Sequence, residues 1–392
     1  MTLTYLVHYG EIALKGRNRP DFERQLADNI ASQHPGSRVE RMRGRMLVGS
    51  QRPLDLSRVF GIAWWAPVER VVAEPELVRQ AGLRLALERM GAAETFAVRV
   101  TRADKRFPLS SQDLERSLGG DIDRASGVTV DLSRPDFTMY VEIAEGVAYL
   151  HTERLPGPRG LPAGISGKLV GLYSAGIDSA VASYLMGKRG AEIELVHFHA
   201  MASAQRAHEA KAGKLAEQIA TFFPGLRVHY VPYHHFQMAT AGLDRHQRQE
   251  LVVFRRYMAR LAEQVAEQTG ALGLFSGDNL GQVASQTLEN LRAVDECLDT
   301  SLFRPLVAYD KQEIIDLGKV LGFDAIANQD YKDCCSIIAE HPATRANMDF
   351  VRHIEQRIDT ERLIGLALEE TETLTYDGRR TGTPEALAPL AC

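Results

Sequence analysis

A short loop holds the side chains best suited to binding phosphate. Residues 172–179 read LYSAGIDS and lie between an apolar run and a helical pattern. Backbone N–H groups at a helix start attract anions, because they lack partners within the helix and lie at the positive end of its dipole. Ser174 and Ser179 add hydroxyl donors, and Asp178 is suited to hold a phosphate through Mg²⁺. We therefore predict a phosphate-binding loop, with an ordinary strand–helix turn capped by serine or aspartate as the plain alternative.

A second polar segment follows the apolar run ALGLFS. Residues 276–288 read SGDNLGQVASQTL. Gly277 allows a tight turn out of a sheet, and Asp278 or Asn279 could cap the next helix. On that predicted helix Gln282 and Gln286 lie four residues apart and share a face. They are either a surface amide pair or two amides that orient a nucleotide or base.

Two adjacent cysteines, Cys334 and Cys335, offer nucleophilic chemistry. A thiolate is a far better nucleophile than a hydroxyl near neutral pH and can carry sulfur as a persulfide. A disulfide between neighbours is strained, so the four cysteines of this chain do not form a disulfide framework. Two other interpretations stay open. One is a pair of small buried side chains, and the other is an iron–sulfur cluster that includes Cys297, although spaced Cys-x-x-Cys pairs are absent.

Strands that alternate with helices position these segments. From residue 169 onward, short apolar strand patterns alternate with longer helical patterns. The predicted helices cover residues 178–188, 204–223 and 247–269. Such βαβ units predict an α/β fold with a doubly wound parallel sheet, in which ligands bind at the carboxyl ends of the strands. Both polar segments come directly after a strand, so we expect them to meet at that edge.

The first 168 residues predict two smaller α/β units. Residues 1–50 read strand, turn, helix and strand, and a second unit runs from Phe60 to Tyr149. The segment 151–168 holds three Pro and four Gly, which makes it the clearest linker in the chain. We place the domains at residues 1–55, 56–155 and 169–392, with the linker at 156–168.

Charge is distributed unevenly along the chain. Residues 1–168 carry 24 Lys and Arg against 21 Asp and Glu, whereas residues 169–392 carry 22 against 30, so net charges of +3 and −8 make up the total of −5. A locally basic surface can bind a polyanion despite that total, because counterion release depends on clustered Lys and Arg. If one strand carries Arg41, Arg43 and Arg45, they form a stripe on one face. The other basic side chains of interest are Lys15, Arg17, Arg19, Arg38, Arg99, Arg102, Lys105 and Arg106.

The composition is that of a globular protein. Hydrophobic residues make up 45% and charged residues 25% of the chain, which is ordinary for a domain with a sizeable core. No apolar run approaches the roughly 20 residues that a membrane span needs, and the N-terminus is too polar for a signal peptide. With reduced cysteines, these features predict a cytoplasmic protein without a membrane partner.

Five segments, in order along the chain, resemble the tRNA 4-thiouridine synthetase (tRNA sulfurtransferase) family. They are GEIALKGRNR at 10–19, SAGIDS at 174–179, GDNLGQVASQTLENL at 277–291, RPLVAYDKQEII at 304–315 and YKDCCSI at 331–337. The similarity covers essentially the whole chain. It implies an N-terminal ferredoxin-like α+β domain, a THUMP domain that binds tRNA, and a PP-loop ATP pyrophosphatase domain. The chain resembles the form without a C-terminal rhodanese domain, and Ala175 stands where the family usually has glycine.

The resemblance also implies roles for individual residues. ATP contacts are implied for Leu172, Tyr173, Ser174, Asp178, Ser179, His197, Phe198, Arg255, Gly277 and Gln286. Catalytic roles are implied for Asp178, Lys311 and Cys335, with Cys334 as an accessory thiol. Contacts to tRNA are implied for Lys15, Arg17, Arg19, Arg102, Lys105 and Arg106. From its spacing alone, Lys311 is more typical of a surface lysine at a helix start. No residue is assigned to a resident metal site.

The reaction that the resemblance implies uses ATP and Mg²⁺. O4 of a tRNA uridine, at position 8 in this family, attacks the α-phosphorus of ATP and releases pyrophosphate. A persulfide on Cys335, supplied by a cysteine desulfurase, then displaces AMP to give 4-thiouridine. A further role as sulfur carrier for the thiamine thiazole is also implied.

Two alternative functions and the oligomeric state stay open at this point. One alternative is a PP-loop enzyme that passes ammonia to the adenylate. The other is a non-catalytic tRNA-binding protein with a degenerate nucleotide loop. A homodimer is one candidate for the oligomeric state.

Overall fold

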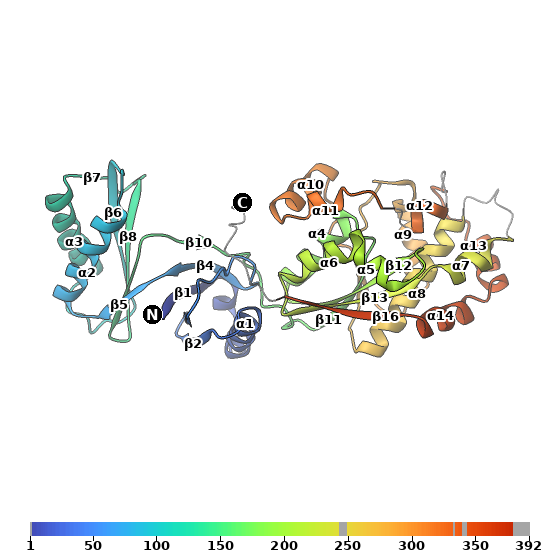
Figure 1. Ribbon diagram of the computed structural model, residues 1–392, viewed down its shortest axis with the longest axis horizontal. Coiled ribbons are helices and arrows are strands. Elements are labelled where there is room, and N and C mark those ends of the chain that lie inside the picture. Colours follow the sequence, from blue (N-terminus) through green and yellow to red (C-terminus); the bar gives the residue numbers. More distant parts are fainter. Residues whose placement is uncertain (1, 243–248, 332–333, 339–342, 379–392) are drawn as a thin grey trace.

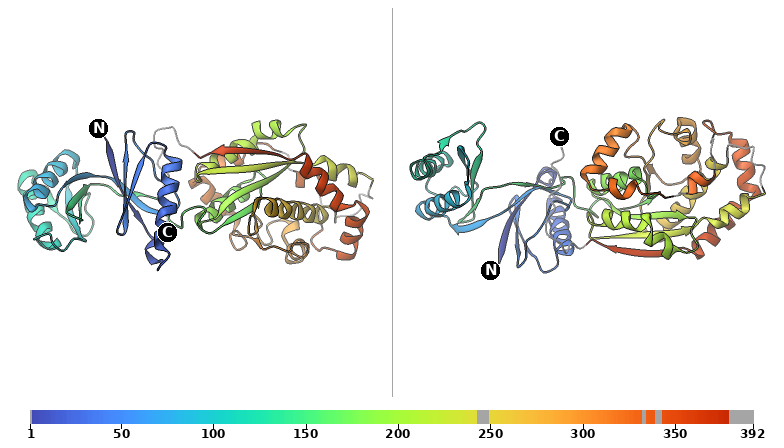
Figure 2. Two further views of the ribbon diagram at one scale, coloured as in Figure 1. Left: turned by 90° about the horizontal axis from the view of Figure 1, so that it is seen from below. Right: turned by 45° about the horizontal axis from the view of Figure 1, so that its top comes forward.

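The computed structural model describes residues 2–242, 249–331, 334–338 and 343–378. Three units lie in a row, with the second domain at one end, the first in the middle and the C-terminal domain at the other end (Figures 1 and 2). The chain therefore leaves the middle unit, forms the end unit and returns through the middle. Among the described residues, no helix has the length and apolar character needed to cross a bilayer.

An antiparallel sheet and one long helix form the first domain. Its strand order is β10–β4–β1–β3–β2. The strands are β1 (Leu3–Tyr9), β2 (Arg38–Met42), β3 (Arg45–Ser50), β4 (Ile62–Pro67) and β10 (Leu155–Pro156). Helix α1 (Arg19–Gln33), which follows the 3-10 turn η1 (Glu11–Leu14), packs on the sheet through Leu26 and Ile30. Because β4 pairs with β1, this domain continues past the boundary expected at residue 55.

The expected arginine stripe is wrong, because a hairpin divides it. Arg41 lies in β2, the chain turns at Gly44 with φ +81, and Arg45 opens β3. Arg45 is buried and donates to Glu142 of the second domain at 2.5 Å. Arg41 and Arg43 remain exposed.

The second domain pairs a mixed sheet with two helices. The strand order is β5–β9–β8–β6–β7. The strands are β5 (Glu69–Val72), β6 (Thr95–Arg102), β7 (Thr129–Val130), β8 (Phe137–Ala144) and β9 (Val147–His151). Helices α2 (Pro75–Arg89) and α3 (Ser111–Ser126) cover the sheet through apolar residues such as Val78, Leu114 and Leu118.

The backbone of the predicted linker is hydrogen-bonded to the domains on both sides of it. Gly157 N–H donates to Ala63 O at 3.1 Å, so its start belongs with the first domain. Leu161 N–H donates to Lys188 O and Ser166 N–H to Gly190 O, both at 2.9 Å. The Pro/Gly composition thus marks a crossing between domains whose backbone is hydrogen-bonded on both sides.

The C-terminal domain confirms the predicted doubly wound sheet. Its order is β15–β14–β11–β12–β13–β16. The strands are β11 (Lys168–Leu172), β12 (Glu192–His199), β13 (Gly225–Pro232), β14 (Leu274–Ser276), β15 (Leu302–Phe303) and β16 (Glu372–Asp377). All pairings are parallel except that of β13 with β16, an antiparallel edge that the sequence analysis did not foresee. The strand order reverses beside β11, and this is where such sheets bind ligands.

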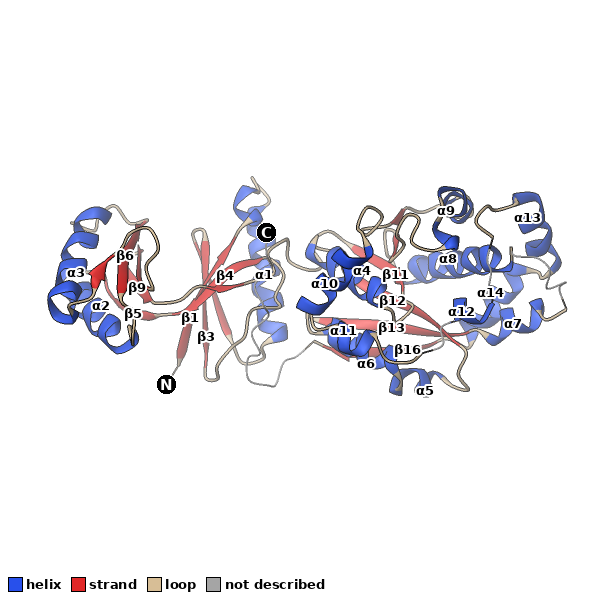
Figure 3. Ribbon diagram, turned by 90° about the horizontal axis from the view of Figure 1, so that it is seen from above, coloured by secondary structure: helices blue, strands red, loops and turns tan. Residues whose placement is uncertain are grey.

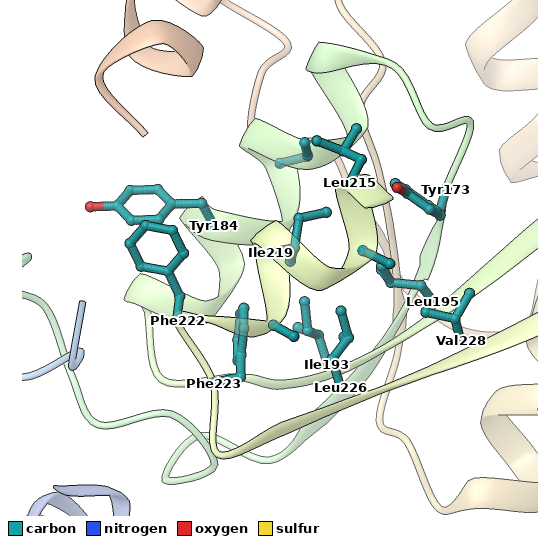
Figure 4. Close-up of a cluster of buried hydrophobic side chains, with 14 of the residues drawn as sticks. Tyr173, Tyr184, Ile193, Leu195, Leu215, Ile219, Phe222, Phe223, Leu226 and Val228 are labelled. Atoms are coloured by element: carbon teal, nitrogen blue, oxygen red, sulfur yellow. The ribbon is translucent and has the colours of Figure 1, made fainter. Parts of the chain in front are cut away.

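Helices cover both faces of this sheet (Figure 3). One face packs on α4 (Ile177–Lys188), α6 (Lys211–Ala220) and α10 (Lys311–Val320), and the other on α8 (Glu250–Thr269), α13 (Met348–Arg357) and α14 (Thr360–Glu369). Neighbouring residues of a strand serve opposite faces: Leu195 packs with the α4 side and Val196 with the α8 side. Figure 4 shows Leu195 among the apolar side chains of the α4–α6 layer.

The helix predicted at 204–223 is interrupted. Helix α5 (Ala204–Glu209) ends at Ala210, whose extended backbone (ψ −167°) separates it from α6. A Cβ on Gly213 would lie 1.7 Å from His208 O, so this glycine lets the two helices approach closely. The shorter elements are α7 (His234–Thr240), α9 (Leu288–Asp295), α11 (Asp324–Ala327), α12 (Cys334–Ile338) and the 3-10 turn η2 (Ala284–Gln286).

An aromatic anchor docks the first domain on the C-terminal domain. Phe60 lies within 5.2–5.8 Å, between ring centroids, of Tyr184, Phe222 and Phe223. Arg189 adds a two-pronged ion pair to Glu11, at 2.8 and 2.9 Å. Apolar burial supplies most of the stability of such contacts, and the ion pair adds orientation.

Candidate nucleotide and sulfur-transfer site

The predicted phosphate loop joins β11 to α4. Ser174 Oγ accepts from Gly176 N–H at 3.3 Å, and Ser179 Oγ donates to the Gly176 carbonyl at 2.9 Å. Ala175 has φ +61, in the left-handed region that favours glycine. Its methyl group is buried in the α4–α6 core, and Ala175 does not line the neighbouring cavity. The residue that departs from the family pattern is therefore accommodated on the core side of the loop.

Gly277 brings the second polar segment against the first. A Cβ on Gly277 would lie 2.8 Å from the Asp178 carbonyl carbon and from Ser179 N, both backbone atoms. Backbone at a helix start cannot yield as a flexible side chain can, so this approach requires glycine. The loops after β11 and β14 meet at the carboxyl edge of the sheet, as predicted.

A cavity of about 280 Å³ lies at this edge. Most predicted ATP contacts line it: Leu172, Tyr173, Ser174, Asp178, Ser179, Phe198, Arg255, Gly277 and Gln286. Val196, Met258 and Val283 supply apolar wall. A polar end beside the helix start and an apolar end between strands suit the phosphates and the base of a nucleotide.

The side chain of His197 does not line the cavity. It is buried, with Nδ1 at 2.8 Å from Tyr173 O and Nε2 at 2.7 Å from the Tyr331 hydroxyl. The ring thus ties the phosphate loop to the residue that precedes the cysteine segment. Sequence reasoning did not single out Tyr331, although it opens the YKDCCSI motif.

Asp178 is the polar centre of the cavity mouth. Its Oδ1 accepts from Lys311 Nζ at 2.6 Å, and its Oδ2 accepts from Gln282 Nε2 at 3.0 Å. Lys311 opens α10, where Asp310 and Glu313 form a capping box. The cap fixes the helix start and with it the lysine, which the structure places beside the phosphate loop.

A buried carboxylate holds the cavity floor. Asp278 accepts from Arg255 at 2.6 Å, Ser276 at 2.8 Å, Gln286 at 3.3 Å and Arg304 at 3.4 Å. Burial acts to raise the pKa of Asp278, but the nearby Arg255 guanidinium, the Ser276 hydroxyl and Arg304 outweigh it and hold this pKa below its usual value. We expected Asp278 or Asn279 as a helix cap and did not assign Arg304. The signal for Arg304 was its place at the start of RPLVAYDKQEII.

The helix expected to carry Gln282 and Gln286 is absent. Gln282 lies in a loop and Gln286 in the turn η2, because the chain becomes helical only at Leu288. The two amides nevertheless converge, since each donates to a site carboxylate. Both side-chain carbonyl oxygens are buried without a hydrogen-bond partner. Such acceptors fit a ligand with N–H or O–H donors, such as a nucleotide base or ribose.

Comparisons with known proteins match this architecture. The model of the thiamine biosynthesis protein (ThiI) family matches residues 164–360, and models of the ThiI ferredoxin-like domain and the THUMP domain match residues 4–65 and 75–153. A probable tRNA sulfurtransferase of Thermus thermophilus is 39% identical, with 98% of this chain and 96% of the relative covered. The chain belongs to the tRNA sulfurtransferase (ThiI) family.

Two further proteins of this family support the assignment. A probable tRNA sulfurtransferase of Acetivibrio thermocellus is 36% identical, with 96% of this chain and 99% of the relative covered. The crystal structure of a 4-thiouridine synthetase in complex with RNA and bound ATP superposes with a TM-score of 0.87 at 32% identity. It covers 96% of this chain and 100% of that chain.

One of the two adjacent cysteines of this tRNA sulfurtransferase family member lines the cavity. Cys334 is buried, lines the cavity and places Sγ 3.4 Å from Phe198 O. Cys335 follows it in α12, and its side chain lies outside the described part of the structure. Cys297 does not line the cavity; its Sγ donates to Val294 O at 3.0 Å, and burial raises its pKa to about 11. Cys297 is therefore held as a thiol at neutral pH, and Cys334 is the one cysteine among the described residues that line the cavity.

The basic residues predicted to contact tRNA have unequal environments. Arg17 and Lys105 are exposed. Lys15 and Arg19 are partly covered beside Glu11 and Glu23. Arg102 donates to the carbonyls of Phe107 and Leu109 at 2.9 and 3.0 Å and braces a loop, while Arg106 pairs with Asp104 at 2.8 Å. Arg17 and Lys105 thus have the surroundings best suited to phosphate contact.

Proposed function

We propose that this enzyme of the tRNA sulfurtransferase family adenylates O4 of a tRNA uridine with ATP and replaces that oxygen with sulfur carried by Cys335. The observation that carries the proposal is the shared cavity: the phosphate loop, Lys311 and the start of the cysteine helix α12 surround one edge of one sheet. Activation and sulfur delivery therefore need no movement of the substrate between sites.

In the first step the uridine O4 attacks the α-phosphorus and pyrophosphate leaves. Negative charge grows on the departing oxygens, where the N–H groups at the start of α4, the hydroxyls of Ser174 and Ser179, and Lys311 can stabilise it. Asp178 would hold Mg²⁺, which supplies charge neutralisation on the phosphates when bound. Lys311 already pairs with Asp178, so the lysine and the carboxylate are held together at the site before the nucleotide arrives.

In the second step the terminal sulfur of a Cys335 persulfide attacks C4, and AMP leaves with the oxygen. The product is a disulfide between Cys335 and the base. A thiolate from Cys334 or from an outside reductant then attacks Cys335 Sγ and releases 4-thiouridine. This attack leaves Cys335 in a disulfide, which an outside thiol reduces to two thiols. A cysteine desulfurase would then transfer a new persulfide sulfur to Cys335, and the same sulfur could serve the thiamine thiazole.

The uridine would come from position 8 of a tRNA that docks along the first two domains. The superposable 4-thiouridine synthetase was crystallised with RNA and ATP, and this chain matches the THUMP domain model. A-form duplex hides its base edges, so the shape of the tRNA would select the nucleotide. Exposed Arg17 and Lys105 offer phosphate contacts on separate domains.

Mass spectrometry of nucleosides tests the proposal. Unmodified tRNA is incubated with ATP–Mg²⁺, a cysteine desulfurase and cysteine, together with wild-type protein, Cys334→Ala, Cys335→Ala or Asp178→Ala. We expect 4-thiouridine from wild type and from Cys334→Ala, none from Cys335→Ala, and pyrophosphate release from all three. Asp178→Ala should release no pyrophosphate.

Three outcomes would each contradict part of the proposal and favour another assignment. Thiouridine from Cys335→Ala but not from Cys334→Ala would move the persulfide to Cys334. ATP cleavage to AMP with no thiouridine from any variant would favour the amide-forming alternative. Absence of pyrophosphate even with tRNA and wild type would favour a non-catalytic tRNA-binding protein.

A further inference from the structure

Two histidines and a glutamate converge on the side of the C-terminal domain that carries α7 and α14. His234 and His235 open α7, directly after β13. Glu370 follows the last residue of α14, two residues before β16. Because β13 and β16 are paired, with Tyr230 opposite Glu372, the two connections emerge side by side.

The geometry of the three side chains is that of metal ligands. His235 Nε2 lies 3.2 Å from one Glu370 oxygen and His234 Nε2 lies 3.5 Å from the other. One ligand atom from each residue falls within 4.8 Å of the others. Ligands that bind zinc at about 2.0–2.1 Å in a tetrahedron lie about 3.3 Å apart. Each imidazole nitrogen lies close to that distance from one of the two Glu370 oxygens, so a small rotation of the carboxylate would bring one oxygen within reach of an ion held by both nitrogens.

Hydrogen bonds within the cluster do not satisfy both imidazoles, because Nε2 of His235 is buried and has no hydrogen-bond partner of acceptable geometry among the described residues. One protonated histidine suffices to neutralise Glu370, and two would repel each other with ring centroids 4.1 Å apart. A bound dication instead satisfies two neutral imidazoles and one carboxylate together. Imidazole nitrogen with a carboxylate is the donor set preferred by zinc and neighbouring transition ions.

We propose that His234, His235 and Glu370 bind a divalent transition-metal ion of the zinc class. His235 is mostly covered, whereas His234 and Glu370 are about half exposed, so an ion can enter and a water can complete the tetrahedron. The ion joins the start of α7 to the end of α14. It acts as a clip across the β13–β16 edge, and none of its three ligands is among the described residues that line the cavity, so the proposed sulfur transfer does not depend on it.

Calorimetric titration with Zn²⁺ and absorption titration with Co²⁺ test the site in full-length protein without a histidine tag, after removal of metal by a chelator. The variants are His234→Ala, His235→Ala and Glu370→Gln. The matched control is His353→Ala, an exposed histidine on α13. We expect one equivalent bound by wild type and control, and an affinity at least tenfold weaker in each of the three variants.

The Co²⁺ spectrum separates this site from the cysteines. Nitrogen and oxygen ligands give visible ligand-field bands without the near-ultraviolet charge-transfer band of a thiolate ligand. Zn²⁺ should also raise the thermal midpoint of wild type and control but not of the variants, since a ligand that binds only the folded state stabilises it. Equal affinity in all proteins, a thiolate spectrum, or no binding by wild type would overturn the proposal.

Discussion

Two buried carboxylates in this molecule, Asp278 and Glu142, bind arginine side chains but have different structural roles. Asp278 lies under the nucleotide cavity, and its partners Arg255, Arg304 and Gln286 all belong to the C-terminal domain. Glu142 lies in β8 of the second domain, and it binds His8 and Arg45 of the first domain at 3.1 and 2.5 Å.

The two carboxylates share their electrostatics but differ in what they join. Burial acts to raise the pKa of Glu142, yet His8 and Arg45 hold it below its usual value, as arginines do for Asp278. Asp278 fixes the orientation of side chains that line the cavity, whereas Glu142 fixes one domain on another. A buried ion pair is weak evidence for stability by itself, so the comparison teaches that each pair specifies an arrangement. Loss of Asp278 should damage the site, and loss of Glu142 should damage domain docking.

The largest effect is expected from Asp278→Ala. It leaves the buried Arg255 guanidinium without its carboxylate and removes one of the two carboxylates that Arg304 contacts, which costs about 3–5 kcal/mol. Urea unfolding followed by circular dichroism measures the loss, and calorimetry should show that ATP binding is lost as well. Asp295→Ala is the matched control, because Asp295 pairs with the same Arg304 but is half exposed. Equal losses in the two variants would remove the special role of Asp278.

The second effect is a pH dependence of stability at the contact between the first two domains, where His151 lies beside Trp64 of β4 with ring centroids 5.6 Å apart. His151 is buried, stacks on Tyr140 with centroids 4.8 Å apart, and donates from Nδ1 to Glu153 O. Burial lowers the pKa of His151 to about 4, and Glu153 and Glu142 only partly oppose this. Between pH 4 and about 6.5 the unfolded chain binds the extra proton, so stability is full above pH 6.5 and falls as pH drops toward 4. The shift corresponds to about 3 kcal/mol.

Tryptophan fluorescence reads this transition, because both tryptophans of the chain, Trp64 and Trp65, lie in β4. Glu142 contributes little to the slope in this window: its pKa is lowered, so its contribution is lost only at still lower pH. His151→Gln should flatten the profile. An unchanged slope in that variant would assign the dependence to another group.

A smaller loss is expected from Glu142→Gln. The amide keeps the shape but removes the charge that His8, Arg45 and Arg154 face, at a cost of about 2 kcal/mol. Limited proteolysis should cut between the first two domains faster, tRNA affinity should fall, and ATP binding should stay unchanged. Glu153→Gln, an exposed change nearby, is the control. Weaker ATP binding in Glu142→Gln would break the separation between site and docking carboxylates.

The sequence predicted the sheet and the meeting of its loops, because strand-to-helix alternation and glycines are local signals. It did not predict how Asp278 is used, since its partners come from α8, η2 and the segment after β15, and only the fold brings these together. The arginine stripe failed for a similar reason: Gly44 makes a hairpin, and Glu142 draws Arg45 inward. The break at Ala210 depends on the close approach at Gly213, which helical periodicity does not register.

The smallest effect concerns Ala175, the position in the phosphate loop at which the sequence resemblance implies glycine. Its left-handed backbone costs about 1–2 kcal/mol relative to glycine, but the buried methyl returns about 0.8 kcal/mol and glycine adds backbone entropy to the unfolded chain. Ala175→Gly should therefore change the free energy of unfolding by less than about 1 kcal/mol. Because the methyl lies on the core side, ATP affinity should change less than about threefold, or about 0.6 kcal/mol.

Ala175→Val separates the cost of the left-handed backbone from the gain of burying the side chain. A β-branched residue is a strong outlier at positive φ, so this variant should lower the free energy of unfolding clearly. A large gain in ATP affinity for Ala175→Gly would show that the methyl group crowds the phosphates after all. The conformation of the phosphate loop would then be determined, as the contacts of Asp278 are, by the requirements of the nucleotide site and not by core packing.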